Sequence, residues 1–225
     1  MYNNDIQKQL HDFYLNDLTS IDTTHNNTIK NKHPEYWNFE RKINNTSFQF
    51  GEHNIWFWSD THFNHNNIIK YSNRPFIDLE EMNNQMINYH NELVQPNDIV
   101  IWCGDIGFGK ETEINNIINQ CNGYKILVVG NHDMTRSGNL YKLKFDEIHP
   151  CLVLQENDIS LWITHYPLDS VPKNTINIHG HTHTINLNEY NINVSVEQTD
   201  YRPISMDSII KRASEYIKPK KKKKK

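Results

Sequence analysis

Short apolar runs, each bounded by turn residues, recur along the chain from residue 54 onward. They are rich in β-branched and aromatic side chains, and this length and composition predict buried strands. The predicted strands cover residues 54–59, 98–103, 125–129, 149–154, 159–164, 175–179 and 191–196.

Between several of these strands the apolar positions repeat at helical spacing. In residues 78–94, Leu79 and Met82 begin an apolar stripe, and Asp78 with Glu81 three residues later forms an N-terminal capping signal. The predicted helices cover residues 5–18, 66–71, 78–94, 111–121 and 206–217. Strands that alternate with helices indicate an α/β protein built in layers.

The two ends of the chain differ in composition from this body, which we place at residues 51–217. We expect residues 1–50 to form an extension, with one short helix followed by an irregular Asn- and Thr-rich arm. Residues 218–225 contain seven lysines and predict a disordered, solubilising tail. Without these lysines, Lys and Arg fall from 23 to 16 against 27 Asp and Glu, so the net charge becomes −11.

An acidic body disfavours a broad nucleic-acid-binding face, and an anionic substrate would need a local source of positive charge, such as bound metal ions. The first residues contain no apolar segment typical of a secretory signal, and no run approaches the length of a membrane helix. The three cysteines are widely spaced beside apolar runs and predict buried thiols. These features favour a cytoplasmic protein in a reducing compartment, without membrane partners.

Side chains that ligate metals follow five of the predicted strands, where the loops of a layered α/β protein converge. In chain order they are Asp60, His62, Asp105, Asn131, His165, His181 and His183. Imidazole nitrogens together with carboxylate oxygens suit Mn, Fe, Zn and similar ions. Seven donors suffice for two ions if one carboxylate bridges them.

The spacing within these blocks supports shared metal ligation. In D-x-H at residue 60 and H-x-H at residue 181, the alternate side chains would point the same way if the segment is extended. Gly104, Gly130 and Gly180 leave room for tight turns and close backbone approach just before the ligands. One such block alone would indicate only a helix cap or a turn, but five blocks in order after successive strands are hard to explain by chance.

This ordered set of motifs resembles the signature of the calcineurin-like metallophosphoesterases over about residues 54–196. The resemblance implies a four-layer α-β-β-α sandwich with mixed sheets and a centre of two divalent cations, with Mn²⁺ foremost and Fe, Zn or Ni as alternatives. It places one ion on Asp60, His62 and His183, the second on Asn131, His165 and His181, and Asp105 between both.

In such a centre a hydroxide activated by the two metals attacks phosphorus. The resemblance implies that His132 acts as general acid on the leaving group and that Asp133 orients its ring, although a turn or helix-cap role also explains Asp133. Arg74 and His65 are predicted to contact the phosphoester substrate, with loop packing as an equal alternative for Arg74. His179 is expected to be a neighbour of the ligands or a surface residue.

The second motif reads GDIGFG and lacks the second Asp and the Arg of the GDxxDRG motif found in protein phosphatases of this superfamily. We therefore expect hydrolysis of phosphodiesters, with phosphomonoesters as further substrates. One alternative is a non-catalytic scaffold on the same fold, although the complete ligand set and His132 argue against it. The other is a nuclease or nucleic-acid-associated protein recruited by the lysine tail, which we do not favour.

Overall fold

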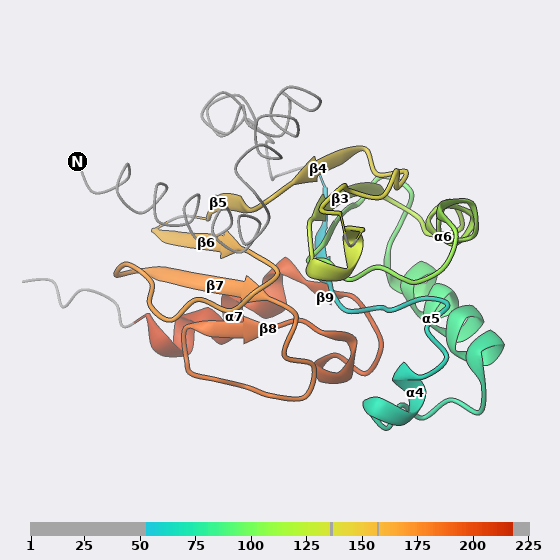
Figure 1. Cartoon of the computed structure of the whole chain (residues 1–225). Helices are drawn as coiled ribbons and strands as arrows, with labels where there is room; N and C mark the ends of the chain where they lie inside the picture. The colour runs from blue at the N-terminus through green and yellow to red at the C-terminus, as the bar shows by residue number, and fades with distance from the viewer. Residues whose placement is uncertain (1–52, 136, 157, 218–225) are drawn as a thin grey trace, which may run out of the picture. The chain divides into compact units, whose positions relative to one another are not determined.

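The computed structural model describes residues 53–135, 137–156 and 158–217 (Figure 1). These residues fall into two units, of which the smaller comprises the described part of 134–141. In that unit Met134 and Leu140 form an antiparallel bridge, and Gly138 at φ 74° turns the chain between them. The predicted helix at 5–18, the extension 1–50 and the lysine tail lie outside the described residues.

The first sheet of the larger unit has five strands in the order β4-β3-β2-β1-β9. They are β1 (Ile55–Trp58), β2 (Ile99–Trp102), β3 (Tyr124–Val128), β4 (Glu147–His149) and β9 (Ile204–Ser205). β1 to β4 are parallel, and β9 runs antiparallel to β1. The carboxyl ends of the four parallel strands therefore share one edge of the sheet.

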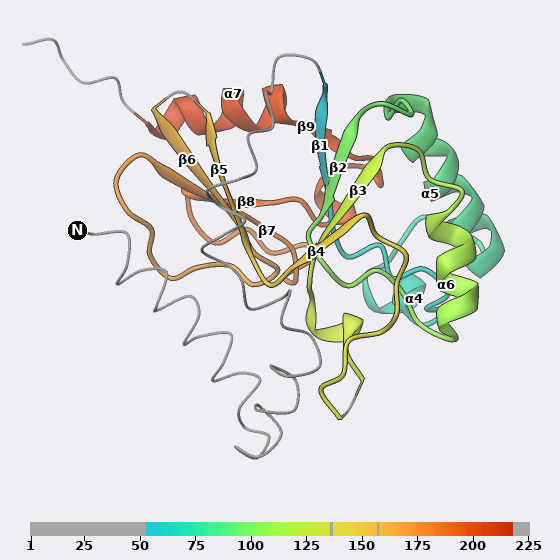
Figure 2. The same cartoon turned by 90° about the horizontal axis from the view of Figure 1, so that it is seen from above.

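The second sheet has four strands in the order β5-β6-β7-β8, and it faces the first sheet (Figure 2). The strands are β5 (Leu152–Glu156), β6 (Ile159–Ile163), β7 (Thr175–His179) and β8 (Asn191–Asn193). β5 is antiparallel to β6, whereas β6, β7 and β8 are parallel. Both sheets are thus mixed, and the predicted α/β fold with two mixed sheets is confirmed.

Alternation along the central strands divides the interior into two apolar clusters. In β2, Ile99 and Ile101 point into the cluster between the two sheets, while Val100 and Trp102 point to the opposite face. Trp102 is fully buried there and packs edge-on against Trp58 of β1 at a ring-centroid distance of 5.0 Å. Burying a large side chain on each face stabilises the sheet by about 2–3 kcal/mol per residue.

Helices cover the outer face of the first sheet, as Figure 2 shows. α5 (Leu79–Leu93) and α6 (Glu111–Ile118) bury Met86 and Ile114 in the outer cluster, and the short α4 (Ile68–Tyr71) adds Ile68. α7 (Met206–Tyr216) instead contributes apolar residues to the cluster between the sheets. Among the residues that the structure describes, no helix combines the length and apolar surface that crossing a membrane would need.

The predicted helices and strands within the described residues are present, with ends that shift by a few residues. The Asp78 side chain caps α5 by accepting the Glu81 N–H at 2.9 Å, while Glu81 accepts from Ile77 N–H at 2.6 Å. The short strands β4 and β9 were not predicted. β4 and β9 have only three and two residues and lie in no apolar run, and their pairing with β3 and β1 defines them.

Candidate metal centre

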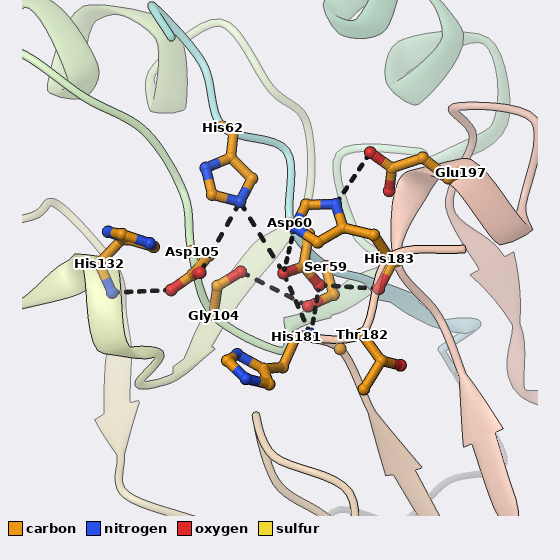
Figure 3. Close-up of polar contacts among 12 residues, drawn as sticks. Ser59, Asp60, His62, Gly104, Asp105, His132, His181, Thr182, His183 and Glu197 are labelled. Atoms are coloured by element: carbon orange, nitrogen blue, oxygen red, sulfur yellow. Dashed lines mark hydrogen bonds and ion pairs between the residues drawn. The ribbon is translucent and has the colours of Figure 1, made fainter. Parts of the chain in front are cut away.

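The loops that follow five strands bring the predicted ligands together at one edge of the two sheets. Figure 3 labels Asp60, His62, Asp105, His181 and His183 among them. β1 and β2 deliver the first three, β3 delivers Asn131, and β6 and β7 deliver the remaining histidines. The donor atoms form two groups, and within each group all of them lie within 4.8 Å of one another. The first group is Asp60, His62 and His183, and the second is Asp105, His165 and His181.

Asn131 and Asp105 extend and connect these groups. Asn131 Oδ1 lies 3.0 Å from His165 Nε2 and 3.2 Å from His181 Nδ1, so it belongs beside the second group. Asp105 Oδ1 lies 3.4 Å from His165 Nε2, while its Oδ2 lies 3.7 Å from His62 Nε2. One carboxylate therefore faces both groups, which is the arrangement that a bridging ligand requires.

The ligand loops do not have the extended backbone that the D-x-H and H-x-H spacing suggested. Five ligands instead adopt the left-handed conformation, with φ between 47° and 66°, and these are Asp60, His62, Asp105, His181 and His183. This conformation costs a residue with a Cβ atom about 1–2 kcal/mol. Each turn re-aims one side chain, so convergence results from strained turns rather than from strand alternation.

Glycines allow the ligand loops to approach one another closely, as the sequence predicted. A Cβ atom on Gly104, whose φ is 92°, would lie 2.6 Å from both Gly130 N and His165 Nδ1. A Cβ atom on Gly180 would collide with Ser59 Oγ and Asp60 Oδ2. These positions exclude any side chain because the neighbouring loops already occupy the space.

His62 shows that these residues suit a bound cation. Its ring is buried, and within the described residues neither ring nitrogen has a hydrogen-bond partner. Burial lowers the pKa of His62 to about 3, so the ring is neutral. Its Nε2 lies near two carboxylates, Asp60 Oδ1 at 3.9 Å and Asp105 Oδ2 at 3.7 Å, and a divalent cation between these atoms would satisfy all three.

The second group is oriented by the backbone of the β2 loop. His165 Nδ1–H donates to the carbonyl of Cys103 at 2.7 Å, which turns Nε2 toward Asp105 and Asn131. Burial opposes a charge on His165, but Asp105 and Asp60 raise its pKa to about 9.

The two carboxylates show the negative charge that the centre must compensate. Burial raises the pKa of Asp60, and the nearby charge of Asp105 raises it further. Burial acts in the same direction on Asp105, but His165 and His62 outweigh it and hold its pKa well below the usual range. Two acids in one buried site are stabilised by positive charge, and divalent cations supply it.

His132 lies beside the first group and is exposed to solvent. Its backbone N–H donates to Asp105 Oδ1 at 2.8 Å, and its ring packs against Phe108 at 4.9 Å and His62 at 5.6 Å. The ring can therefore reach a group bound at the metal centre.

Asp133 has a different place from the one expected, because its buried carboxylate binds backbone N–H groups of two loops. It accepts three backbone N–H groups, from Gly130 at 2.7 Å, Ile106 at 2.9 Å and Asp105 at 3.0 Å. The structure thus corrects the predicted ring-orienting role. Asp133 joins the β2 and β3 loops, which agrees with its alternative interpretation as a turn residue.

Arg74 is also placed differently from its predicted contact with substrate. Its side chain is fully buried, and the guanidinium donates to the carbonyls of Asp60 at 2.7 Å and Thr61 at 2.8 Å and to the carboxylate of Glu197. No N–H group is directed toward solvent where a substrate would bind. The loop-packing alternative describes Arg74 better.

The other predicted histidines lie close to the ligands. His65 is half-buried, stacks on Phe108 at 4.1 Å and lies 5.6 Å from His62, so it borders the centre. His179 is buried, which excludes the surface role, and its Nδ1–H donates to the Gly180 carbonyl at 2.7 Å. His179 is in neither donor group.

Two contributors to the site were missed by sequence reasoning. Ser195 Oγ donates to Asp60 Oδ2 at 2.9 Å, and the backbone N–H of His181 donates to both Asp60 oxygens, at 2.9 Å to Oδ2 and 3.1 Å to Oδ1. Asp60 Oδ1 also lies 3.9 Å from His62 Nε2 and 3.8 Å from His183 Nε2. Glu197 accepts from His183 Nδ1 at 3.0 Å. Both lie in a stretch without repeated metal-ligand types, so no spacing indicated them.

A sandwich of two mixed sheets with paired His–carboxylate clusters at the strand ends defines a metallohydrolase. The profile of the calcineurin-like phosphoesterase family matches residues 53–224, and the chain belongs to this family. Membership supports a hydrolase of phosphoric esters.

Two relatives share most of this domain. The uncharacterized protein MJ1445 of Methanocaldococcus jannaschii is 38% identical over 169 residues, which cover 70% of this chain and 89% of the relative. The crystal structure of the protein of unknown function AQ665 from Aquifex aeolicus aligns with a TM-score of 0.56 and 28% identity, covering 71% of this chain and 99% of that one.

Proposed function

We propose that this phosphoesterase hydrolyses phosphodiesters, and more slowly phosphomonoesters, at a centre of two divalent cations, with Mn²⁺ as the preferred ion. The observation that carries the proposal is the pair of three-donor groups with Asp105 facing both. Each group suits one ion, and their histidine and carboxylate donors match the preferences of Mn²⁺, Fe²⁺ and Zn²⁺.

The ligand residues would hold the cations, with Asp60, His62 and His183 on one and Asn131, His165 and His181 on the other. Two bound divalent cations lower the pKa of a water molecule and neutralise charge on phosphoryl oxygens. The acidic body can thereby accept an anionic substrate. His132 is exposed, whereas Asp60, Asp105 and His165 are buried, and this supports approach of the substrate from the side of His132.

His132 donates the proton that the leaving group needs. Its ring is exposed and lies beside both Phe108 and His62, at 4.9 Å and 5.6 Å, which supports a place near the leaving group. Protonation of this oxygen stabilises it as the bond to phosphorus breaks, and such general acids contribute about 10²–10⁴-fold to the rate. An alkoxide is a poor leaving group, so its departure depends on this acid.

The test is hydrolysis of bis(4-nitrophenyl) phosphate with Mn²⁺, compared with 4-nitrophenyl phosphate. We expect a higher kcat/KM for the diester, and we expect His132→Ala to bind two Mn²⁺ ions while a diester with an alkyl leaving group loses about 10²-fold or more in kcat. A wild-type chain that is inactive with Mn²⁺, Fe²⁺, Zn²⁺ and Ni²⁺ would instead support the scaffold alternative.

A further inference from the structure

Glu197 and Arg74 form a buried ion pair at the edge of the first donor group. Glu197 lies in the 3-10 turn η3 (Val196–Gln198), and its side chain is 3% exposed, while that of Arg74 is 0% exposed. Glu197 Oε1 accepts from Arg74 Nε at 3.0 Å and Nη2 at 2.8 Å. A buried ion pair of this kind contributes little net stability, because desolvation offsets the attraction.

The same carboxylate oxygen controls a metal ligand. His183 Nδ1–H donates to Glu197 Oε1 at 3.0 Å (Figure 3), and the opposite ring atom, Nε2, lies 3.8 Å from Asp60 Oδ1. A proton held on Nδ1 leaves the lone pair on Nε2, directed at the first donor group. Carboxylates that hold a histidine in this way orient the ring and raise its basicity toward a metal.

Arg74 connects this pair to the other side of the donor group. Its guanidinium donates to the carbonyl oxygens of Asp60 and Thr61, within the turn where Asp60 has a φ of 54°. Arg74 thus fixes the backbone of one ligand, and Glu197 fixes the ring of another. In the second group the ring of His165 is held by a backbone carbonyl, since its Nδ1–H donates to Cys103 at 2.7 Å.

We propose that Glu197 and Arg74 are positioning residues that set the cation affinity of the first donor group and leave that of the second unchanged. The inference rests on the metal centre of the proposed function. It assigns a role to the η3 segment, which contains none of the metal ligands, and it explains why a charged pair is buried beside the site.

The Mn²⁺ affinity of each donor group is measured by itself, in a variant that lacks one ligand of the other group. The full chain with His181→Ala keeps the first group, and the chain with His62→Ala keeps the second. Glu197→Gln is then added to each, and Mn²⁺ binding is measured by isothermal titration calorimetry. We expect about 10–100-fold weaker binding in the His181→Ala background and less than about 2-fold change in the His62→Ala background.

A matched control uses the ion pair between Arg202 Nη2 and Glu92 Oε2, at 3.4 Å on the surface. Glu92→Gln removes the same charge outside the centre, and we expect it to change neither affinity. If Glu197→Gln fails to fold, as judged by circular dichroism, Glu197→Asp keeps the charge but is too short to reach both partners, and the same selective loss is expected.

The inference is overturned if Glu197→Gln weakens Mn²⁺ binding equally at both groups or changes it at neither. A general structural role would not distinguish the two groups. If the Glu197→Gln variants give one of these results while the wild-type chain binds two Mn²⁺ ions, the proposed function stands and only this inference fails. A wild-type chain that binds no divalent cation overturns the proposed function and this inference together.

Discussion

The ligand residues of the metal centre carry unfavourable backbone conformations that the surrounding loops enforce. Asp60 and His62 have φ values of 54° and 48°, and their N–H groups donate to the carbonyls of Gly104 at 3.0 Å and Asp105 at 3.1 Å. Such conformations persist where several contacts determine them together. These turns and contacts hold the donor atoms of the two groups close together.

Gly180 provides a test of this close packing at the residue scale. We expect Gly180→Ala to weaken Mn²⁺ binding by about 10-fold or more, because the added Cβ atom collides with Ser59 Oγ and Asp60 Oδ2 and displaces a ligand. Calorimetric titration of the purified variant measures the affinity.

The control for this substitution is Gly123→Ala, at the opposite end of β3 from the ligands. Gly123 has φ 90°, so alanine there strains the backbone and lowers stability by about 1 kcal/mol without touching the centre. Mn²⁺ affinity should stay at the wild-type value. If Gly180→Ala binds Mn²⁺ with the wild-type affinity, the loops can move to accommodate the added Cβ atom without displacing Asp60.

At the element scale, β1 and β2 are fastened together at the end that lies away from the metal centre. Asp98, which immediately precedes β2, accepts Asn54 Nδ2–H at 2.9 Å, Trp56 Nε1–H at 3.0 Å and Gln95 N–H at 2.9 Å. These bonds set the register of the two strands, and the register in turn determines where Asp60 and Asp105 emerge at the other end.

The Asp98 bonds predict a pH-dependent contribution to stability. Burial alone would raise the pKa of Asp98, but the donors from Gln95, Trp56 and Asn54 outweigh it and lower the pKa. A lowered pKa means that stability is present above the unfolded value near 3.9 and is lost as pH falls through the folded value. We expect Asp98→Asn to reduce the free energy of unfolding at pH 7 by about 1 kcal/mol and to flatten its decline below about pH 4.

Urea unfolding at several pH values measures this effect. Asp207→Asn, which removes an exposed acid from the first turn of α7, is the control and should keep the steeper acid decline of the wild type. An unchanged decline in Asp98→Asn would mean that the three donors do not stabilise the charged form.

At the scale of the whole molecule, the metal centre joins the two sheets. Asp60 follows a strand of the first sheet, and His183 follows a strand of the second, yet both belong to one donor group. Cations bound there connect loops from both sheets and have no equivalent site in the unfolded chain. Binding is therefore coupled to the stability of the entire fold.

We expect Mn²⁺ at 100 times its dissociation constant to raise the free energy of unfolding by about 2.7 kcal/mol per site. For a chain of this size each kcal/mol corresponds to a rise of about 2–4 °C in Tm. Differential scanning calorimetry with Mn²⁺ and with EDTA measures the difference. Asp105→Asn alters the carboxylate that faces both groups, so this variant should lose most of the Mn²⁺-dependent rise in Tm. A wild-type Tm that does not change with Mn²⁺ would contradict the coupling.

Much of the fold and most of the ligand set followed from local features of the sequence. Apolar runs of strand length identified the central strands, since a strand buried on both faces needs apolar residues at every position. Ligands in short motifs directly after these strands could be recognised because parallel strands bring their carboxyl ends to one edge. The strands β4 and β9 and the left-handed ligand turns could not be recognised from the sequence, because long-range pairing and loop packing define them.

Local motifs alone predicted the family, the seven candidate metal ligands and their order along the chain, since these depend on residues adjacent to predicted strands. The roles of the neighbouring charged residues became clear only from the fold. Arg74 and Glu197 are 123 positions apart and meet under the first donor group, and Asp133 accepts the N–H groups of a loop from another strand. The packing of loops that are distant in the sequence determines which group pairs with a buried charge, and the local spacing of residues does not predict this packing.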